Sequence, residues 1–198
     1  ILIDSDDISL TNINRQIHAL ETTIGQKKTL MMKERILAIN PQAKVTTIEK
    51  LYTPESNFFN WDDDYTYIVD AVDDVKAKIN LIVNANKHNL PIMSSMGTAN
   101  KLDPQKFVIT DIYKTHTCPL ARIMRKTLKQ QGIKKLKVLY STEEPFTNYT
   151  VNFKENTSKD NSPASTRKQP LGSISFVPPI AGLMIAGEIV KDICQINR

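Results

Sequence analysis

The hydrophobic positions of this chain alternate between short β-branched runs and longer stretches with helical spacing. Residues 1–3 and 45–48 are short strand-like runs, while Met32 and Ile36 lie at helical spacing within residues 25–40. The remaining predicted strands cover residues 65–72, 91–95, 107–112 and 138–141, and the remaining helices cover residues 75–89, 119–131 and 178–194. Such alternation is typical of βαβ units, so we predict an α/β fold with a doubly wound, mostly parallel sheet and antiparallel strands at its edge.

The last third of the chain departs from this alternation. Residues 143–173 are rich in Asn, Ser, Thr, Lys and Glu over a length well beyond ordinary connections, and we expect a mobile loop there. In the last helix, Gly182, Ala186 and Gly187 predict close packing on the sheet, and Cys194 is expected to pack in the interior. The small residues of this helix also suit a dimer interface.

The composition indicates a globular chain without a membrane span. With 198 residues, 40% of them hydrophobic, it is long enough for a substantial core, and we expect a single domain over residues 1–198. The longest apolar stretch, residues 176–190, is interrupted by two prolines and Glu188. The two cysteines and three histidines lack zinc-ligand spacing, and so few cysteines suit a reducing cytoplasm.

The formal net charge of +5 is unevenly placed. Between Lys101 and Tyr140, basic residues greatly outnumber acidic ones, and the charges concentrate in residues 122–137. This basic segment either contacts a polyanion such as RNA or is an ordinary solvated helix face.

Polar residues follow two of the predicted strands. Asp4 ends the first one, where a carboxylate can bind ribose hydroxyls or simply form a turn. Asp70 and Asp73 lie at the end of the 65–72 strand, where a carboxylate can hold Mg²⁺ against a phosphate. Asp74 directly precedes a helix and is expected to cap it.

Two lysines, Lys27 and Lys28, stand at the predicted N-terminus of the 25–40 helix, where the helix dipole disfavours cations. An anion bound at that end would explain them, because phosphate can use both free N–H groups and an ammonium charge. The alternative is that both lysines extend into water.

Several of these residues fall into a combined pattern. The pattern consists of Asp4-Ser5-Asp6, Asn12-x-Asn14-Arg15-Gln16, Gly25-Gln26-x-Lys28, Ile39-Asn40-Pro41 and Val69-Asp70-Ala71-Val72-Asp73. In order and spacing it resembles the ThiF/MoeB/HesA adenylating enzymes, relatives of ubiquitin-activating enzymes with a Rossmann-like fold. The resemblance implies that Asp4 binds the ATP ribose, that Asn12, Arg15 and Lys28 bind the phosphates with support from Gln16, and that Asp73 positions Mg²⁺.

Other runs resemble the dehydratase branch of this family. They are residues 15–20 (RQIHAL), residues 94–101 (SSMGTANK) and residues 111–117 (DIYKTHT). The branch implies ATP-dependent cyclisation of threonylcarbamoyladenosine in tRNA through an acyl-adenylate, in a cytoplasmic homodimer. It also implies dependence on a monovalent cation, Na⁺ or K⁺, and a sulfur-relay protein partner.

The chain departs from the family pattern in two places. The glycine-rich G-x-G-x-x-G turn and the strand before it are missing, and residues 1–3 then lack a central neighbour, so we expect that the sequence begins inside the fold. The zinc-binding cysteine pairs of sulfur-carrier-activating relatives are also missing. Activation of a ubiquitin-like sulfur carrier and a non-catalytic nucleotide-binding scaffold are the alternative functions.

Cys118 is a candidate transfer thiol, because a cation in its basic surroundings could lower its pKa. The other interpretation, which we prefer, is a cysteine that starts a helix before Pro119. The implied chemistry requires no cysteine.

Overall fold

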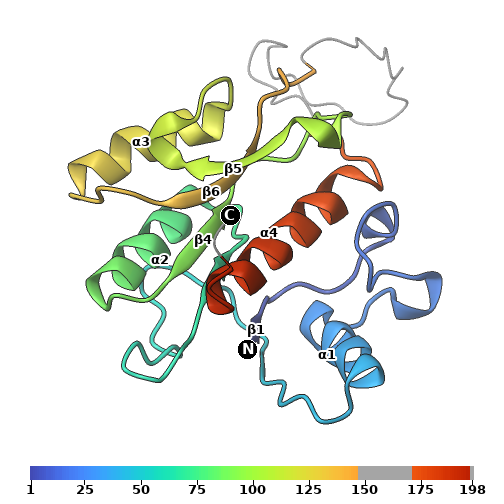
Figure 1. The fold of residues 1–198 in the computed structure, drawn as a ribbon. Coiled ribbons are helices and arrows are strands. Elements are labelled where there is room, and N and C mark those ends of the chain that lie inside the picture. Colours follow the sequence, from blue (N-terminus) through green and yellow to red (C-terminus); the bar gives the residue numbers. More distant parts are fainter. Residues whose placement is uncertain (147–170, 197–198) are drawn as a thin grey trace, which may run out of the picture.

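A computed structural model describes residues 1–146 and 171–196 (Figure 1). The helices are α1 (Lys28–Ile39), α2 (Val75–Lys87), α3 (Pro119–Gln130) and α4 (Val177–Ile193). The strands are β1 (Leu2–Ile3), β2 (Thr47–Ile48), β3 (Ile68–Asp70), β4 (Ile92–Ser95), β5 (Phe107–Asp111) and β6 (Lys137–Ser141). All the helices and strands predicted from the sequence are present. Most of the loop predicted over residues 143–173 lies outside the described residues.

The strands form a sheet of mixed direction and a separate parallel pair. In the four-stranded sheet the order is β3-β4-β6-β5; β3, β4 and β6 are parallel, and β5 runs antiparallel at the edge. Strands β1 and β2 pair in parallel with each other. The prediction of a mostly parallel sheet with an antiparallel edge is confirmed.

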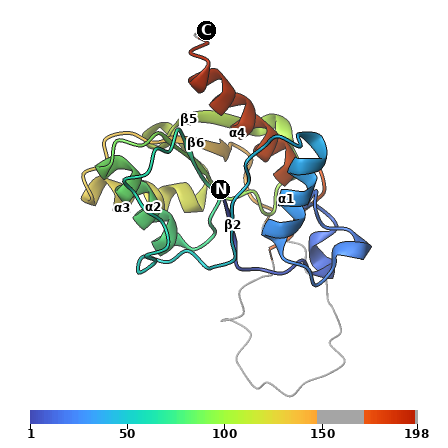
Figure 2. The ribbon, with the colours of Figure 1, turned by 90° about the horizontal axis from the view of Figure 1, so that it is seen from below.

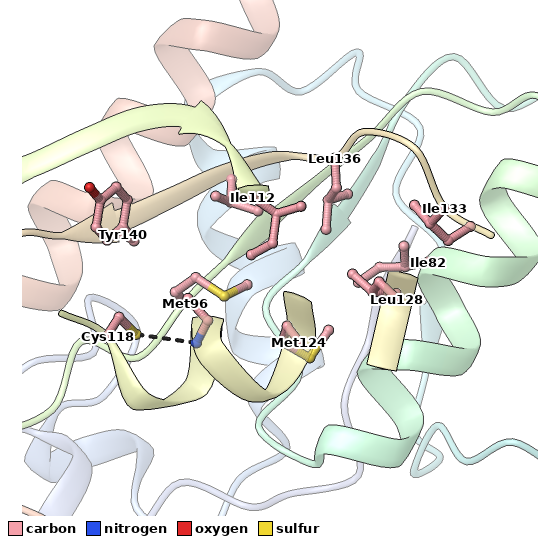
Figure 3. Packing of buried hydrophobic residues seen from close by; sticks show 11 residues of the cluster. Ile82, Met96, Ile112, Cys118, Met124, Leu128, Ile133, Leu136 and Tyr140 are labelled. Atoms are coloured by element: carbon pink, nitrogen blue, oxygen red, sulfur yellow. Dashed lines mark hydrogen bonds between the residues drawn. The ribbon is translucent and has the colours of Figure 1, made fainter. Parts of the chain in front are cut away.

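Helices cover both faces of the four-stranded sheet. Along β6, Val138 and Tyr140 pack into a core with α2 and α3, which Figure 3 shows from close by. The intervening Leu139 packs in a second core with buried residues of α4, the helix that crosses the sheet in Figure 1. This alternation is the period of two expected for a strand buried on both faces.

Helix α4 turns a different face to the sheet than we predicted. Val177, Ala181 and Ile185 are its buried residues, whereas Gly182 and the other small residues predicted to pack on the sheet are exposed. Each predicted position comes one or two residues after a buried one, and a step of one residue turns a helix by about 100°. Cys194 is exposed as well, because it lies in the turn after the helix ends, so its predicted packing was wrong.

Helix α1 begins at Lys28 rather than at the predicted Gly25. Gly25 has φ +80°, a left-handed conformation that glycine adopts without a steric penalty and that a right-handed helix excludes. The tight turn at Gly25 directs the chain into the helix and leaves Lys27 as its N-cap residue.

Strands β1 and β3 face each other across a gap. They are not hydrogen-bonded, and Val69, in the middle of β3, is 50% exposed. Ile3 of β1 and Ile68 of β3 line the same cleft. Figure 2 shows α1, which packs on the β1–β2 pair, and α3, which belongs to the larger sheet, at opposite sides of the molecule. Among residues 1–146 and 171–196, no strand pairs with β1 or β3 on the side that faces this gap.

Candidate functional site

A cleft of about 720 Å³ opens at the carboxyl ends of β1 and β3. It gathers every residue that the sequence predicted for the site. These residues are Asp4, Asn12, Arg15, Gln16, Lys28 and Asp73. They come from four separate segments of the chain, so the fold itself assembles them. A carboxyl edge of parallel strands is where α/β sheets bind their ligands.

Lys28 is held by acidic residues that follow β1. Its Nζ lies 2.6 Å from Asp6 Oδ2 and 3.9 Å from Asp4 Oδ2. Lys27 is paired separately, with Asp7 at 2.7 Å. Neither lysine therefore simply extends into water at the start of α1. Lys28 is only 14% exposed, whereas Asp6 is 62% exposed, and both line the cleft at the N-terminus of α1, where the first backbone N–H groups of a helix lack intrahelical partners.

Asn12 and Arg15 are positioned by local hydrogen bonds. Asn12 is buried, and its Oδ1 accepts from the Ser9 backbone N–H at 3.1 Å. Arg15 Nη1 donates to the Thr11 carbonyl and to Asn14 Oδ1, both at 2.9 Å. These bonds leave further guanidinium N–H groups for an anion, since the side chain has five donors. The short turn Leu10–Asn12 thus places an amide and a cation on one wall of the cleft.

Several buried polar atoms have no hydrogen-bond partner among the described residues, and Gln16, which carries one of them, lines the cleft. They are Gln16 Oε1, both ring nitrogens of His18, Thr29 Oγ1 and Ser173 Oγ. Burial lowers the pKa of His18, and the charge of Lys28 lowers it further, while Asp4 opposes the shift. His18 is thus kept neutral close to the cationic side of the cleft. Sequence reasoning assigned it no role, since a single histidine carries no spacing signal.

The connection from β3 to α2 presents Asp73 to the cleft. Asp70 is fully buried at the end of β3, and Asp74 caps α2 by accepting from Ala77 N–H at 2.8 Å, as predicted. Asp73 lies between them, exposed and without a hydrogen bond or ion pair to any described residue.

No group of three or more His, Cys, Asp or Glu residues in the described segments could hold a metal ion by itself. A single free carboxylate fits Mg²⁺, which keeps several waters and is usually held by one or two carboxylates together with substrate phosphates.

Cys118 has a structural role. Its thiol is buried, and Sγ accepts from the Ala121 N–H at 3.5 Å, so that it caps α3 (Figure 3). A reactive thiol needs access and a stabilised thiolate. The interpretation as a helix-starting cysteine is confirmed.

Only part of the basic segment faces solvent as free charge. Arg122, Lys126 and Lys129 are exposed at spacings of four and three residues, and therefore form one stripe along α3. Arg125 instead donates to the Thr115 carbonyl at 2.9 Å, which ties α3 to the loop before it. Lys137 is bound to Asp192 of α4 at 2.6 Å.

A larger cleft of about 1050 Å³ lies at the opposite edge of the sheet. It contains none of the predicted site residues. Lys137 bridges Glu188 and Asp192 there, and Tyr67 also donates to Asp192, at 2.8 Å. Hydrogen bonds from Lys137 lower the pKa of both carboxyl groups. This cluster joins the end of α4 to the sheet.

A mostly parallel α/β sheet with cations and carboxylates at its carboxyl edge defines a Rossmann-type nucleotide-binding domain. The chain belongs to the ThiF family, whose model matches residues 1–198.

Several of the relatives and solved structures that this chain resembles are tRNA threonylcarbamoyladenosine dehydratases. The Bacillus subtilis dehydratase is 41% identical over 198 residues, covering 98% of this chain and 77% of the relative. Two crystal structures of the Escherichia coli dehydratase TcdA have the same fold. The AMP complex has a TM-score of 0.78 at 28% identity, covering 98% of this chain and 75% of that one. The ATP complex has a TM-score of 0.74 at 27% identity, covering 99% and 77%. The predicted family and Rossmann-like fold are confirmed.

Proposed function

We propose that this protein is an ATP-dependent enzyme that cyclises threonylcarbamoyladenosine in tRNA by removing water. The observation that carries the proposal is the single cleft in which Lys28, Arg15 and Asp73 meet from distant parts of the sequence. The 41% identity to a dehydratase over nearly the whole chain supports this substrate over a sulfur-carrier protein. The AMP and ATP complexes of TcdA support ATP as the second substrate.

Each site residue then has a proposed part. Asp4 binds the ribose hydroxyls, and Asn12, Arg15 and Lys28 bind the phosphates, with Gln16 supporting that group. Asp73 holds Mg²⁺, which supplies positive charge where the phosphates accumulate negative charge. The residue types support this division, because ammonium and guanidinium groups form strong charge-assisted hydrogen bonds with phosphate oxygens.

The chemistry needs no protein nucleophile. A threonyl carboxylate oxygen attacks the ATP α-phosphorus and releases pyrophosphate, which leaves an acyl-adenylate. The neighbouring carbamoyl group then attacks the acyl carbon, loses a proton to solvent and displaces AMP as the ring closes. Catalysis rests on holding the carboxylate in line and on neutralising phosphate charge, for which Arg15 and Lys28 are placed. The buried, helix-capping Cys118 is consistent with this scheme.

The gap between β1 and β3 also belongs to the proposal. We propose that a further parallel strand, followed by a glycine-rich turn, fills it in the complete fold. Two observations support this: no described strand pairs with either edge at the gap, and Val69 is half-exposed. Backbone N–H groups of such a turn would bind the ATP phosphates.

The decisive experiment is ATP–pyrophosphate exchange by the full gene product. We expect exchange only with tRNA that carries threonylcarbamoyladenosine, and its abolition by Arg15→Ala or Asp73→Ala with the melting temperature preserved. Exchange that requires a carrier protein would instead favour sulfur-carrier activation. A lack of exchange under every condition would favour a non-catalytic scaffold.

We further propose that the exposed stripe Arg122, Lys126 and Lys129 on α3 contacts tRNA phosphates. Reversing all three charges to Glu should weaken tRNA binding and lower the slope of log K against log salt by about 2–3, since each phosphate contact contributes about 0.7–0.9. The matched control reverses the exposed Lys44, Lys76 and Lys87. An equal loss in both variants would point to net charge instead of a specific surface.

The quaternary structure and further partners remain predictions. A homodimer is supported by the exposed apolar stripe of α4, where Leu183 is 71% and Val190 55% exposed. Leu183→Glu should then shift the sedimentation coefficient toward the monomer, whereas Ile39→Glu, at a 75% exposed position on α1, should not. The sulfur-relay partner, the monovalent cation and the cytoplasmic location are inferred from sequence. In residues 1–146 and 171–196, no helix is long and apolar enough to cross a membrane.

A further inference from the structure

Lys78 is a fully buried cation that joins three elements at the carboxyl edge of the sheet. It belongs to the first turn of α2 and is 1% exposed. Its Nζ donates to Asp70 Oδ2 of β3 at 2.9 Å, and to Ser94 Oγ and the Ser95 carbonyl of β4 at 3.3 and 3.0 Å. All three ammonium donors are therefore used.

This network is poorly explained as packing alone. Asp70 and Ser94 are completely buried, and Ser94 Oγ also donates to Asp70 Oδ2 at 2.5 Å. Burial lowers the pKa of Lys78, and the charge of Asp70 only opposes that shift. A buried ion pair generally stabilises a fold no more than apolar residues of similar volume would. What it adds is a fixed geometry, because each group must keep its partners.

The geometry that the network fixes is that of the loop carrying Asp73. At the start of the loop, Asp70 Oδ1 accepts from the Val72 N–H at 3.1 Å. At its end, the Lys78 backbone N–H donates to the Asp74 carbonyl at 2.9 Å. The Lys78 side chain therefore acts on the start of the loop through Asp70, while the end of the loop is held by the first backbone hydrogen bond of α2. Asp73 itself is exposed and forms no hydrogen bond or ion pair with a described residue, although its charge acts on Lys78.

We propose that Lys78 is a positioning residue which, through Asp70, holds the β3–α2 loop so that the Asp73 carboxylate is placed to bind Mg²⁺ with ATP. The inference rests on the proposed role of Asp73. Mg²⁺ requires near-octahedral coordination, so a carboxylate binds it best when the backbone that carries it is already in the right position. Displacements of about 1 Å are costly in such sites.

The test measures ATP binding by calorimetry in the full gene product, with MgCl₂ and again with EDTA. Lys78→Met removes the charge and keeps an unbranched side chain of similar length. We expect its ATP affinity in EDTA to stay within about twofold of the parent. The gain in affinity that Mg²⁺ confers should fall at least about tenfold, and the half-saturating Mg²⁺ concentration should rise. A general structural defect would weaken binding equally with and without Mg²⁺, and that result would overturn the proposal.

Two further variants make the outcome decisive. Lys76→Met is the matched control, because Lys76 is exposed two residues away on the same helix; it should leave both affinities unchanged. If Lys78→Met does not fold, Ser94→Ala takes its place. It removes one contact to Lys78 and one to Asp70, and an unchanged Mg²⁺ dependence would overturn the proposal.

Asp73→Ala separates this inference from the proposed function. Loss of the Mg²⁺ effect in Asp73→Ala, together with a normal effect in Lys78→Met, would refute the positioning role and leave the proposed site intact. A normal Mg²⁺ effect in Asp73→Ala would refute both the metal role of Asp73 and the positioning role.

Discussion

The ion pair between Lys28 and Asp6 leads to a quantitative prediction about ATP binding. Lys28 Nζ lies 2.6 Å from Asp6 Oδ2, and this carboxylate is 62% exposed. If Lys28 binds a phosphate, the phosphate competes with Asp6 for the ammonium group. Asp6→Asn keeps the size of the side chain and removes the competing charge. We therefore expect Asp6→Asn to bind ATP more tightly than the parent.

The size of the effect follows from the exposure of the pair. Ion pairs at the surface contribute about 0.2–1 kcal/mol, which corresponds to a decrease in Kd of about 1.4-fold to fivefold. The backbone N–H of Asp6 donates to Asp4 Oδ1 at 2.8 Å. This hydrogen bond does not involve the Asp6 carboxylate, so the turn should persist in Asp6→Asn. Calorimetric titration of the full gene product with MgATP measures the change.

Asp7→Asn is the matched control for this prediction. Asp7 lies next to Asp6 and is 55% exposed, but its partner is Lys27, at 2.7 Å. Both variants change the net charge equally. An equal decrease in Kd would therefore show a general charge effect, and an increase in Kd for Asp6→Asn would refute the competition that we infer.

Three further predictions concern other residues. Cys118→Ser should retain pyrophosphate release, because Ser is also a good N-cap; loss of release with the fold intact would restore the thiol mechanism. Lys137→Met should lower stability by about 1 kcal/mol, or the melting temperature by about 2–4 °C, because Asp192 and Glu188 lose their cation. The difference in stability between the parent and Lys137→Met should shrink as the pH falls through the lowered pKa values of these carboxyl groups, because the parent then loses the same ion pairs. Calorimetry measures this difference, and a constant value would argue against the ion pairs. The lowered pKa of His18 means that the folded state binds fewer protons than the unfolded state below about pH 6.5, so the parent should lose more stability on acidification than His18→Gln. Melting temperatures at about pH 7.5 and about pH 5.5 test this, and parallel curves would contradict it.

The order of helices and strands and their exposed polar residues were predictable from sequence for local reasons. Hydrophobic period distinguishes strands from helices, and caps such as Asp74 act within a single turn. The site residues could be named because their motifs lie in loops directly after strands, where the parallel sheet must bring them to one edge. Family resemblance then gave each residue its expected role.

The missed features involve residues distant in sequence or faces set by packing. The side of α4 that meets the sheet depends on the orientation in which Ala181 and Ile185 dock, which small residues alone do not reveal. The pairing of Lys28 with Asp6 depends on contacts across 22 positions. Lys78 resembles an ordinary helix lysine in sequence, and only its burial against Asp70 and Ser94 distinguishes it.

The sequence by itself determined the class of fold and predicted the residues of the candidate site, because both depend on periodicity and on short motifs. Only the tertiary structure decided which charges are free, which are paired and which are buried. Those properties follow from how segments distant in sequence meet, because the electrostatic free energy of a side chain depends on its neighbours and its exposure to water. The same lysine type therefore lies at the candidate nucleotide site as Lys28, forms a buried ion pair with Asp70 as Lys78 and joins α4 to the sheet as Lys137.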